Sequence, residues 1–317
     1  MDLSLGISLL RELPERAAAI PEDRALAKYL SNFARRFATG IENEEPDDMY
    51  PPGFWLFLPF STAADFPCVS PEQVRHLALA STCMIIYDIL FDATVDSPGR
   101  PDIHTQVLAE YSLACMYEHL HALFPSGSPF WEQYTPMYER FLSSMIEERT
   151  HKGKPQPYAY EDYDRISRQK MSMVLVNPIG LAVLGSVPER IPNLLSTWDE
   201  LNVAVVIIDD IKDWEEDYQD GNYTYLLADA LRLNEGVISL PESEEALITQ
   251  VVFSGAMEDL YQRGASHLDR AAGLAYETGA PALAHLAEER AVMFRKFGRQ
   301  LMLRKLDGLR EHLAGEA

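Results

Sequence analysis

The sequence lacks the residues on which several large classes of protein depend. It contains only three cysteines, at positions 68, 83 and 115, and none has the Cys-x-x-Cys spacing. Neither a disulfide framework nor a cysteine zinc site is indicated, so we expect reduced, buried cysteines in a cytoplasmic protein. The chain also has no Gly-x-x-x-x-Gly-Lys loop, His-Glu-x-x-His helix or Gly-x-Ser-x-Gly turn, which argues against P-loop nucleotide-binding proteins, zinc metalloproteases and serine hydrolases.

Basic residues are also scarce. There are 27 Lys and Arg against 49 Asp and Glu, which gives a net charge of −22. This charge would repel nucleic acid and anionic membranes, so we expect neither as a partner. A diphosphate would be repelled too, unless metal ions bridge it to the protein. We find no apolar stretch of the roughly 20 residues that span a bilayer and no leader with a basic start and an apolar core, so we predict no membrane span.

Convincing alternating strand patterns are absent, and helical periodicity dominates. Ser70-Pro71-Glu72-Gln73 has the features of a helix start, with Ser as the cap and Pro in the first turn. Turn-forming clusters separate further predicted helices at residues 102–124, 128–151, 160–185, 192–218, 222–233, 243–278 and 281–314. No Gly/Ser-rich or singly charged linker divides the chain. We therefore predict one all-α domain over residues 1–317, with helices packed around a central core or cavity.

A first group of acids, the first ladder, consists of Asp88, Asp92 and Asp96. Asp88 and Asp92 fall near the predicted C-terminal end of an apolar helix, where the helix dipole disfavours bare carboxylates. No basic residue lies between Arg75 and Arg100, so capping or local ion pairs explain these acids poorly. We predict that Asp88 and Asp92 bind metal, whereas Asp96, past the predicted helix end, is the weaker candidate.

A second group of acids, the second ladder, consists of Asp209, Asp213 and Asp217. The twelve residues from 209 to 220 hold seven carboxylates and one lysine, Lys212. A solvated helix end explains the later acids, but it explains Asp209 and Asp213 poorly, because they follow directly on an apolar run.

The four-residue spacing of both ladders brings their carboxylates close together on one side of a helix. Residues four apart on a helix lie about 6 Å apart along the axis on nearly the same side. Carboxylates stacked in this way repel one another, and apolar neighbours increase the cost. Mg2+ prefers carboxylate, water and phosphate oxygens. The ladders therefore predict magnesium ions that bind a diphosphate.

These residues resemble the motifs of the class I isoprenoid synthase superfamily, which includes terpene cyclases and trans-prenyltransferases. The segment Asp88-Ile89-Leu90-Phe91-Asp92 is similar to the Asp-Asp-Leu-Phe-Asp motif of bacterial-type cyclases, with Ile in place of one Asp. Asp209-Asp210, Asp213 and Asp217 match the spacing of the second cyclase motif, with Asp213 in place of Ser or Thr. The same segment also matches the prenyltransferase pattern Asp-Asp-x-x-Asp. The resemblance covers both motifs, their separation and the helical pattern.

The resemblance implies three Mg2+ ions between two acidic helices, at the mouth of an apolar cavity, held by Asp88, Asp92, Asp209, Asp213 and Asp217. It also implies an upstream arginine that contacts the diphosphate. Arg165 and Arg168 are the candidates, because residues three apart can share a helix face and arginine suits bidentate contact with phosphate. Surface ion pairs are the alternative for either. Lys212 is a further predicted diphosphate contact, whereas Lys170 is expected to point elsewhere.

Aromatic residues beside the first ladder complete the predicted site. Tyr87 and Phe91 are expected to stabilise a carbocation with their ring faces, although ordinary core packing is the alternative. Two features of the superfamily are missing. The C-terminal Arg-Tyr pair of many cyclases has only loose substitutes. The N-terminal Gly-Gly-x-x-x-Arg region of chain-elongating prenyltransferases is absent, which favours a single allylic substrate.

We therefore predict a Mg2+-dependent terpene cyclase, a carbon–oxygen lyase. It would ionise an allylic prenyl diphosphate, farnesyl or geranylgeranyl diphosphate, and cyclise the cation with release of diphosphate. A prenyltransferase, including a head-to-head synthase of the squalene or phytoene type, is the first alternative. A non-catalytic helical binding protein with acidic surface charge is the second. The resemblance also implies a possible homodimer.

Overall fold

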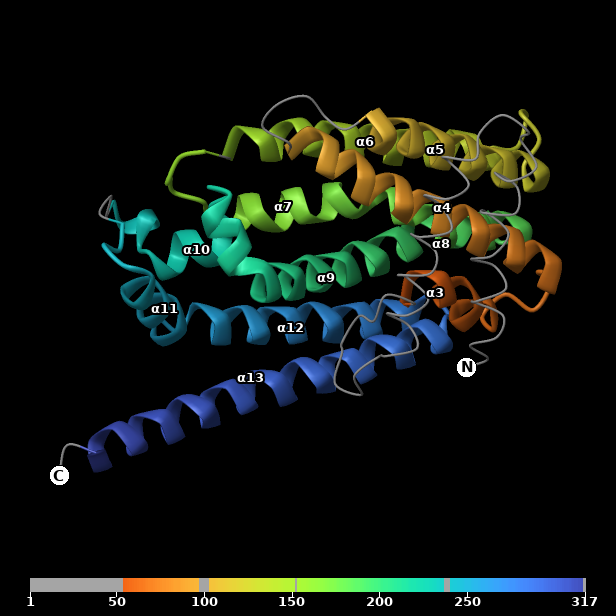
Figure 1. Ribbon diagram of the computed structural model, residues 1–317. Helices are drawn as coiled ribbons and strands as arrows, with labels where there is room; N and C mark the ends of the chain where they lie inside the picture. The colour runs from red at the N-terminus through yellow and green to blue at the C-terminus, as the bar shows by residue number, and fades with distance from the viewer. Residues whose placement is uncertain (1–53, 97–102, 152, 237–239, 316–317) are drawn as a thin grey trace. The chain divides into compact units, whose positions relative to one another are not determined.

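The structure, a computed structural model, describes residues 54–96, 103–151, 153–236 and 240–315. The regular elements of these ranges are all helices (Figure 1), so the all-α prediction is confirmed. Two compact units alternate along the chain. Unit 1 comprises Met1–Tyr134 and Val176–Ile191, and unit 2 comprises Thr135–Leu175 and Pro192–Ala317.

Unit 1 is organised around one long helix, α4. The elements of the unit are α3 (Phe54–Ala63), α4 (Pro71–Asp96), α5 (Ile103–Leu123), the first turns of α6 (Pro129–His151), α8 (Val176–Leu184) and η2 (Pro188–Arg190). The start of α4 is the predicted one. The Gln73 N–H donates to the Ser70 hydroxyl at 3.2 Å, and the Ser70 N–H donates to Oε1 of Gln73 at 2.8 Å. This reciprocal capping satisfies two of the amide groups that a helix start leaves open.

α4 is apolar along much of its length because it packs against α3, α5 and α8. Its contact with α8 is close, since a Cβ on Gly180 would lie 2.6 Å from Cδ2 of Leu77. Ser81 also donates to Oδ1 of Asn177 at 2.6 Å. The segment Pro71–Thr94 is long and apolar enough to cross a membrane by length and composition alone, but 61% of its most apolar window is buried inside the protein, as in a core helix.

Unit 2 contains the remaining helices. They are α7 (Tyr160–Lys170), η1 (Met171–Leu175), α9 (Ile191–Gln219), α10 (Tyr225–Ala230), η3 (Leu233–Glu235), α11 (Glu244–Phe253), α12 (Ala256–Glu277) and α13 (Pro281–Gly315). The predicted helix at 243–278 is divided, because Gly255 takes a left-handed conformation with φ of +88°. α12 and α13 pack along each other (Figure 1).

The predicted helix at 160–185 is also interrupted. Residues Met171–Leu175 form a buried 3-10 turn, and unit 1 resumes at the next residue. Side chains support the altered backbone, because the Ser172 hydroxyl donates to the Met137 carbonyl at 2.7 Å and the Asn202 amide donates to the Met171 carbonyl at 3.2 Å. Pro178 lacks the N–H that would bond to Val174. The break therefore lies in the residues that precede this proline, within the range that was predicted as one continuous helix.

Candidate functional site

The first ladder lies near the end of α4 in unit 1. Asp88 and Asp92 are both half-buried, and the helix continues past the predicted end to Asp96. The two carboxylates are therefore one to two turns inside the helix, where the unfavourable dipole effect is weaker than at the terminus. The side chain of Asp96 lies outside the described residues.

The aromatic pair beside this ladder is formed by Tyr87 and Phe91. Their ring centroids are 5.4 Å apart and the planes are inclined by 19°. Tyr87 is buried, whereas Phe91 is half-buried. Residues four apart on a helix meet in this way. Contact with a carbocation stays a prediction for both rings.

The second ladder lies on the C-terminal half of α9 in unit 2. Asp209 and Asp213 are exposed, and Asp217 is half-buried. The buried acid is the adjacent Asp210, which is 9% exposed. The sequence-based argument that Asp209 and Asp213 emerge from a buried helix is thus modified. α9 turns Asp210 inward, while the two ladder residues face outward and are accessible to a ligand.

Burial sets the protonation of the inward-facing acids. It raises the pKa of Asp217 to about 6, with the charge of Asp209 acting in the same direction and the Asn222 amide, 2.7 Å from Oδ1, acting against it. Burial also raises the pKa of Asp210 well above its usual range, and the charges of Asp217 and Asp209 add to the effect. Cations near these acids would relieve the repulsion.

Tyr163 of α7 lies behind Asp210. Its hydroxyl is near enough to lower the pKa of that carboxyl. Neither this hydroxyl nor Oδ2 of Asp210 makes a full hydrogen bond within the described part of the chain, although both atoms are buried. A buried polar atom without a hydrogen bond lowers the stability of the fold. Tyr163 and Asp210 therefore place two such atoms beneath the second ladder.

The ladder carboxylates could hold a divalent ion only if water or a bound diphosphate supplied the remaining metal ligands. Among the described residues, no three His, Cys, Asp or Glu side chains converge closely enough to hold a metal ion. Mg2+ commonly takes one or two carboxylates and completes its shell with water and substrate phosphates. Accessible, mutually repelling carboxylates such as Asp209 and Asp213 suit that kind of binding.

Lys170, the last residue of α7, was set aside from the sequence but acts on the second ladder. Its positive charge lowers the pKa of both Asp210 and Asp217, against the larger effect of burial. Its ammonium also donates to Glu148 at 3.0 Å. No local sequence pattern marks this role, because it depends on how α7 packs beside α9.

Arg165 and Arg168, the predicted diphosphate contacts, are both engaged with carboxylates in unit 2. Arg165 is exposed and makes two hydrogen bonds to Glu147, of 2.6 and 2.8 Å. Arg168 is half-buried and makes two hydrogen bonds to Asp164, of 2.8 and 3.0 Å, and one of 2.9 Å to Glu200. The two arginines therefore face different neighbours, and either would have to exchange a carboxylate for a phosphate.

Glu200 of α9 is the centre of a dense polar cluster. Besides Arg168, it accepts from Arg270 Nε at 2.9 Å, and Nδ1 of His267 lies 2.7 Å away. Burial opposes ionisation of this carboxyl, but the hydrogen bonds and charges of His267 and Arg168 lower its pKa to about 2. Nε2 of His267 lies 2.7 Å from the Tyr160 hydroxyl. Nδ1 of His267 also lies 2.7 Å from Nη2 of Arg270, so the ring lies within hydrogen-bond distance of Glu200, Arg270 and Tyr160, and its tautomer sets which of them it donates to.

Lys212 is exposed on α9, and its predicted role stays a prediction. So does a facing arrangement of the two ladders across an apolar cavity, because Asp88 and Asp92 belong to unit 1 and the second ladder belongs to unit 2.

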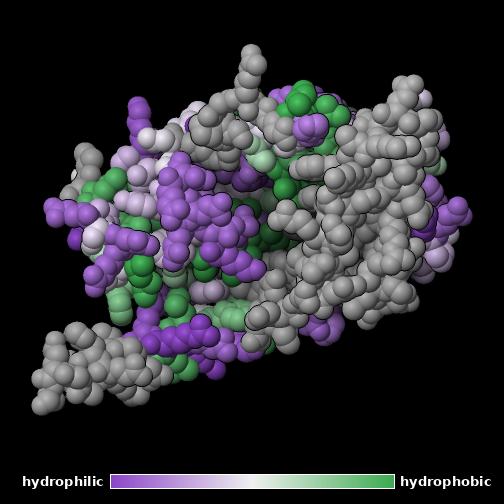
Figure 2. Space-filling model, in the orientation of Figure 1, coloured by the Kyte–Doolittle hydropathy of each residue, from purple (hydrophilic) through white to green (hydrophobic). Residues whose placement is uncertain are grey.

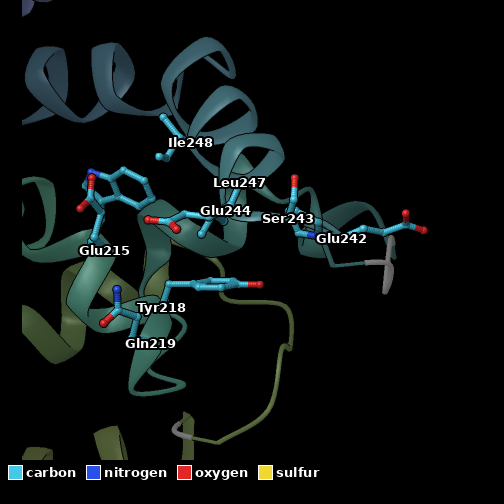
Figure 3. Close-up of a pocket in the computed structure, with 10 residues that line it drawn as sticks. Glu215, Tyr218, Gln219, Glu242, Ser243, Glu244, Leu247 and Ile248 are labelled. Atoms are coloured by element: carbon cyan, nitrogen blue, oxygen red, sulfur yellow. The ribbon is translucent and has the colours of Figure 1, made fainter.

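A pocket of about 350 Å³ lies beside the end of α9. Its lining includes Trp214 and Tyr218 of α9 together with Glu215, Glu242 and Glu244. Figure 3 shows the ring of Tyr218 next to Glu244. The three carboxylates would repel a diphosphate, so this pocket is a poor diphosphate site.

No protein-family model matches the chain, and no curated protein matches its sequence. Solved structures do match its fold. A decaprenyl diphosphate synthase from Rhodobacter capsulatus aligns over 91% of this chain and 96% of its own, with 14% identity and a TM-score of 0.65. A geranylgeranyl pyrophosphate synthase from Lactobacillus brevis ATCC 367 aligns over 92% and 96%, with 13% identity and a TM-score of 0.67.

A third match is a geranylgeranyl pyrophosphate synthase from Corynebacterium glutamicum, described as complexed with isoprenyl diphosphate and magnesium. It aligns over 91% of this chain and 98% of its own, with 15% identity and a TM-score of 0.59. The predicted lyase class is wrong by this comparison, because the matching enzymes are prenyltransferases. The fold of this chain is that of the all-helical isoprenyl diphosphate synthases.

Proposed function

We propose that the protein is a divalent-metal-dependent prenyltransferase that joins an allylic prenyl diphosphate to a second isoprenoid unit. The observation that carries the proposal is the second ladder, which presents Asp209 and Asp213 on the surface of α9 within an isoprenyl diphosphate synthase fold. This reaction was the first alternative from the sequence. The missing Gly-Gly-x-x-x-Arg region means that the acceptor unit would be bound by other residues.

In this proposal the ladders hold Mg2+ through Asp88, Asp92, Asp209, Asp213 and Asp217. When bound, the ions neutralise the diphosphate and assist its departure as Lewis acids. The protein supplies the accessible oxygens of the ladders. Asp210 and Tyr163 support α9 from behind, and their burial keeps the helix face that carries the ladder directed outward.

Two basic residues are the best diphosphate contacts in this proposal. Lys170 acts electrostatically on the second ladder. Arg165 is exposed and pairs with Glu147, which is half-buried, and exchanging a partner so close to the surface for a phosphate costs little. Arg168 is less suitable, because its partner Glu200 is largely buried and strongly ionised.

The decisive assay supplies Mg2+ and geranyl, farnesyl or geranylgeranyl diphosphate, each with and without isopentenyl diphosphate. A prenyltransferase yields a longer prenyl diphosphate only when both substrates are present, and hydrolysis of that product followed by chromatography gives its chain length. A cyclic hydrocarbon formed from one substrate would contradict the proposal. A longer product without the second substrate would point to another acceptor.

Matched variants test the site. Asp209→Asn removes a ladder charge, whereas Asp220→Asn removes an exposed charge just beyond α9. We expect a loss of at least about a hundredfold in rate for the first, in line with the effect of removing a group that stabilises transition-state charge. The second should behave like the unmodified protein. Equal effects of the two variants would remove the ladder from the mechanism.

A further inference from the structure

The last helix, α13, is positively charged in an otherwise acidic chain. Its residues 290–306 include six basic side chains and no acidic one, whereas the whole chain has a net charge of −22. Two of the six pair with α12, since Arg295 contacts Asp269 and Lys305 contacts Glu258. Of the other four, Lys296, Arg299 and Arg304 are exposed.

Large apolar side chains are exposed on the same stretch of α13. Val292 is 63% exposed, Leu303 is 54% exposed and Leu306 is 45% exposed. Residues 292, 299, 303 and 306 follow the spacing of one helix face. Arg299 lies on that face and has no carboxylate within ion-pair distance among the residues that the structure describes. We call the following set the α13 face: Val292, Lys296, Arg299, Met302, Leu303 and Leu306.

A groove between α12 and α13 continues this surface. It has a volume of about 360 Å³, and its lining includes Tyr261, Phe294 and Gly298. It also includes Arg299 and Met302, so the groove opens directly onto the α13 face. Figure 2 shows hydrophilic and hydrophobic surface side by side on the short coloured part of the lower edge.

We propose that the α13 face docks on the surface of an anionic lipid bilayer. Lys296 and Arg299 would contact lipid phosphates, and Met302, Leu303 and Leu306 would enter the boundary between headgroups and acyl chains. Apolar side chains at a bilayer surface bury themselves at the boundary of headgroups and acyl chains, and Lys and Arg close to that surface are attracted to anionic lipids. This inference does not depend on the proposed catalytic function.

Charge favours a bilayer over the other occupants of such a face. The net charge of −22 opposes an anionic surface only within a screening distance of about 8 Å at physiological salt. The stretch of α13 without acids is the part proposed to come this close, and Glu258, which also lines the groove, is paired with Lys305. A symmetric pair of copies joined through the α13 face would instead place Arg299 and Lys296 of one copy near those of the other, which is repulsive.

Sedimentation of the full chain with vesicles tests the proposal. Vesicles of phosphatidylcholine alone are compared with vesicles in which roughly a third of the lipid is phosphatidylglycerol. We expect binding to the anionic vesicles only, weakened by added salt. One basic charge near such a surface changes partitioning about fivefold, so Arg299→Glu, which changes two charges, should reduce it about thirtyfold. Leu303→Gln should also reduce it.

Control variants separate the α13 face from general charge and hydrophobicity. Lys154→Glu changes an exposed charge, and Ile146→Gln changes a side chain that is 74% exposed on α6. Both should bind vesicles like the unmodified chain. All four altered positions are exposed, so thermal unfolding should be unchanged for each variant, and the readout is the vesicle-bound fraction.

Three results would overturn the proposal. The first is equal binding to both vesicle types, or equal binding by Arg299→Glu and the unmodified chain. The second is release from vesicles by inorganic phosphate at constant ionic strength, which would assign the groove to free phosphate. The third is self-association that Arg299→Glu abolishes, without vesicle binding, which would assign the face to a second copy.

Discussion

Glu200→Gln is the substitution for which the structure supports the most quantitative prediction. The Glu200 side chain is 13% exposed and lies among Arg168, His267 and Arg270. These partners, acting against burial, lower its pKa from 4.5 to about 2. One pKa unit corresponds to about 1.4 kcal/mol, so ionised Glu200 contributes roughly 3 kcal/mol to the free energy of unfolding at neutral pH.

The sign and the pH range follow from the lowered pKa. Because the folded protein holds the carboxylate more strongly than the unfolded chain does, the contribution is complete above about pH 4.5. It is lost as the pH falls from there toward about 2. We expect Glu200→Gln to be less stable by about 3 kcal/mol at pH 7 and by roughly 1.5 kcal/mol at pH 3.

Urea unfolding followed by tryptophan fluorescence measures both values. Glu235→Gln is the matched control, because Glu235 also has an arginine partner and a lowered pKa but is exposed. Exposed pairs contribute little, so no measurable change is expected. The reasoning is refuted if Glu200→Gln lies within about 0.5 kcal/mol of the unmodified chain at pH 7, or if its effect is the same at pH 3.

Three further predictions concern the ladder and the core. Asp213→Asn should abolish the Mg2+-dependent binding of inorganic diphosphate, measured by calorimetry. The melting temperature should not change, because the Asp213 side chain is exposed. Unchanged diphosphate binding would exclude Asp213 as a metal ligand. Lys170→Met should raise the pKa of Asp217 above about 6, which a carboxyl NMR titration would detect. Gly264→Ala should cost about 1–3 kcal/mol in urea unfolding, because the added methyl would overlap the ring of Phe294. Gly273→Ala, on the same helix with open space around it, should instead stabilise by up to about 1 kcal/mol; the same sign for both would contradict the packing argument.

Much of the helical architecture could be predicted because its signals are local. Ser70 and Gln73 lie three residues apart, and their reciprocal hydrogen bonds depend on no distant contact. The helix breaks were harder to predict. The break at residues 171–175 is supported by Asn202, about thirty residues away in the sequence, and such support leaves no local pattern.

The candidate site divides in the same way. The four-residue spacing placed Asp209, Asp213 and Asp217 on one helix face, but Asp210 is the acid that α9 buries. Which side of α9 is buried depends on how α9 packs against α7. The spacing of residues along one helix does not contain that information. The predicted lyase failed for a related reason, since the motif of the second ladder is compatible with both cyclase and transferase, and the fold comparison favours the latter.

The sequence alone determined the all-helical class and the positions of the two ladders, because helix periodicity acts over a few residues. That their carboxylates need cations stays a prediction, which rests on charge repulsion over the same short range. Only the tertiary structure decided which charges interact. It brought Lys170 near the second ladder and enclosed Arg168 with Glu200 and His267. These pairs come from helices far apart in the chain, and packing of the helices sets their distances.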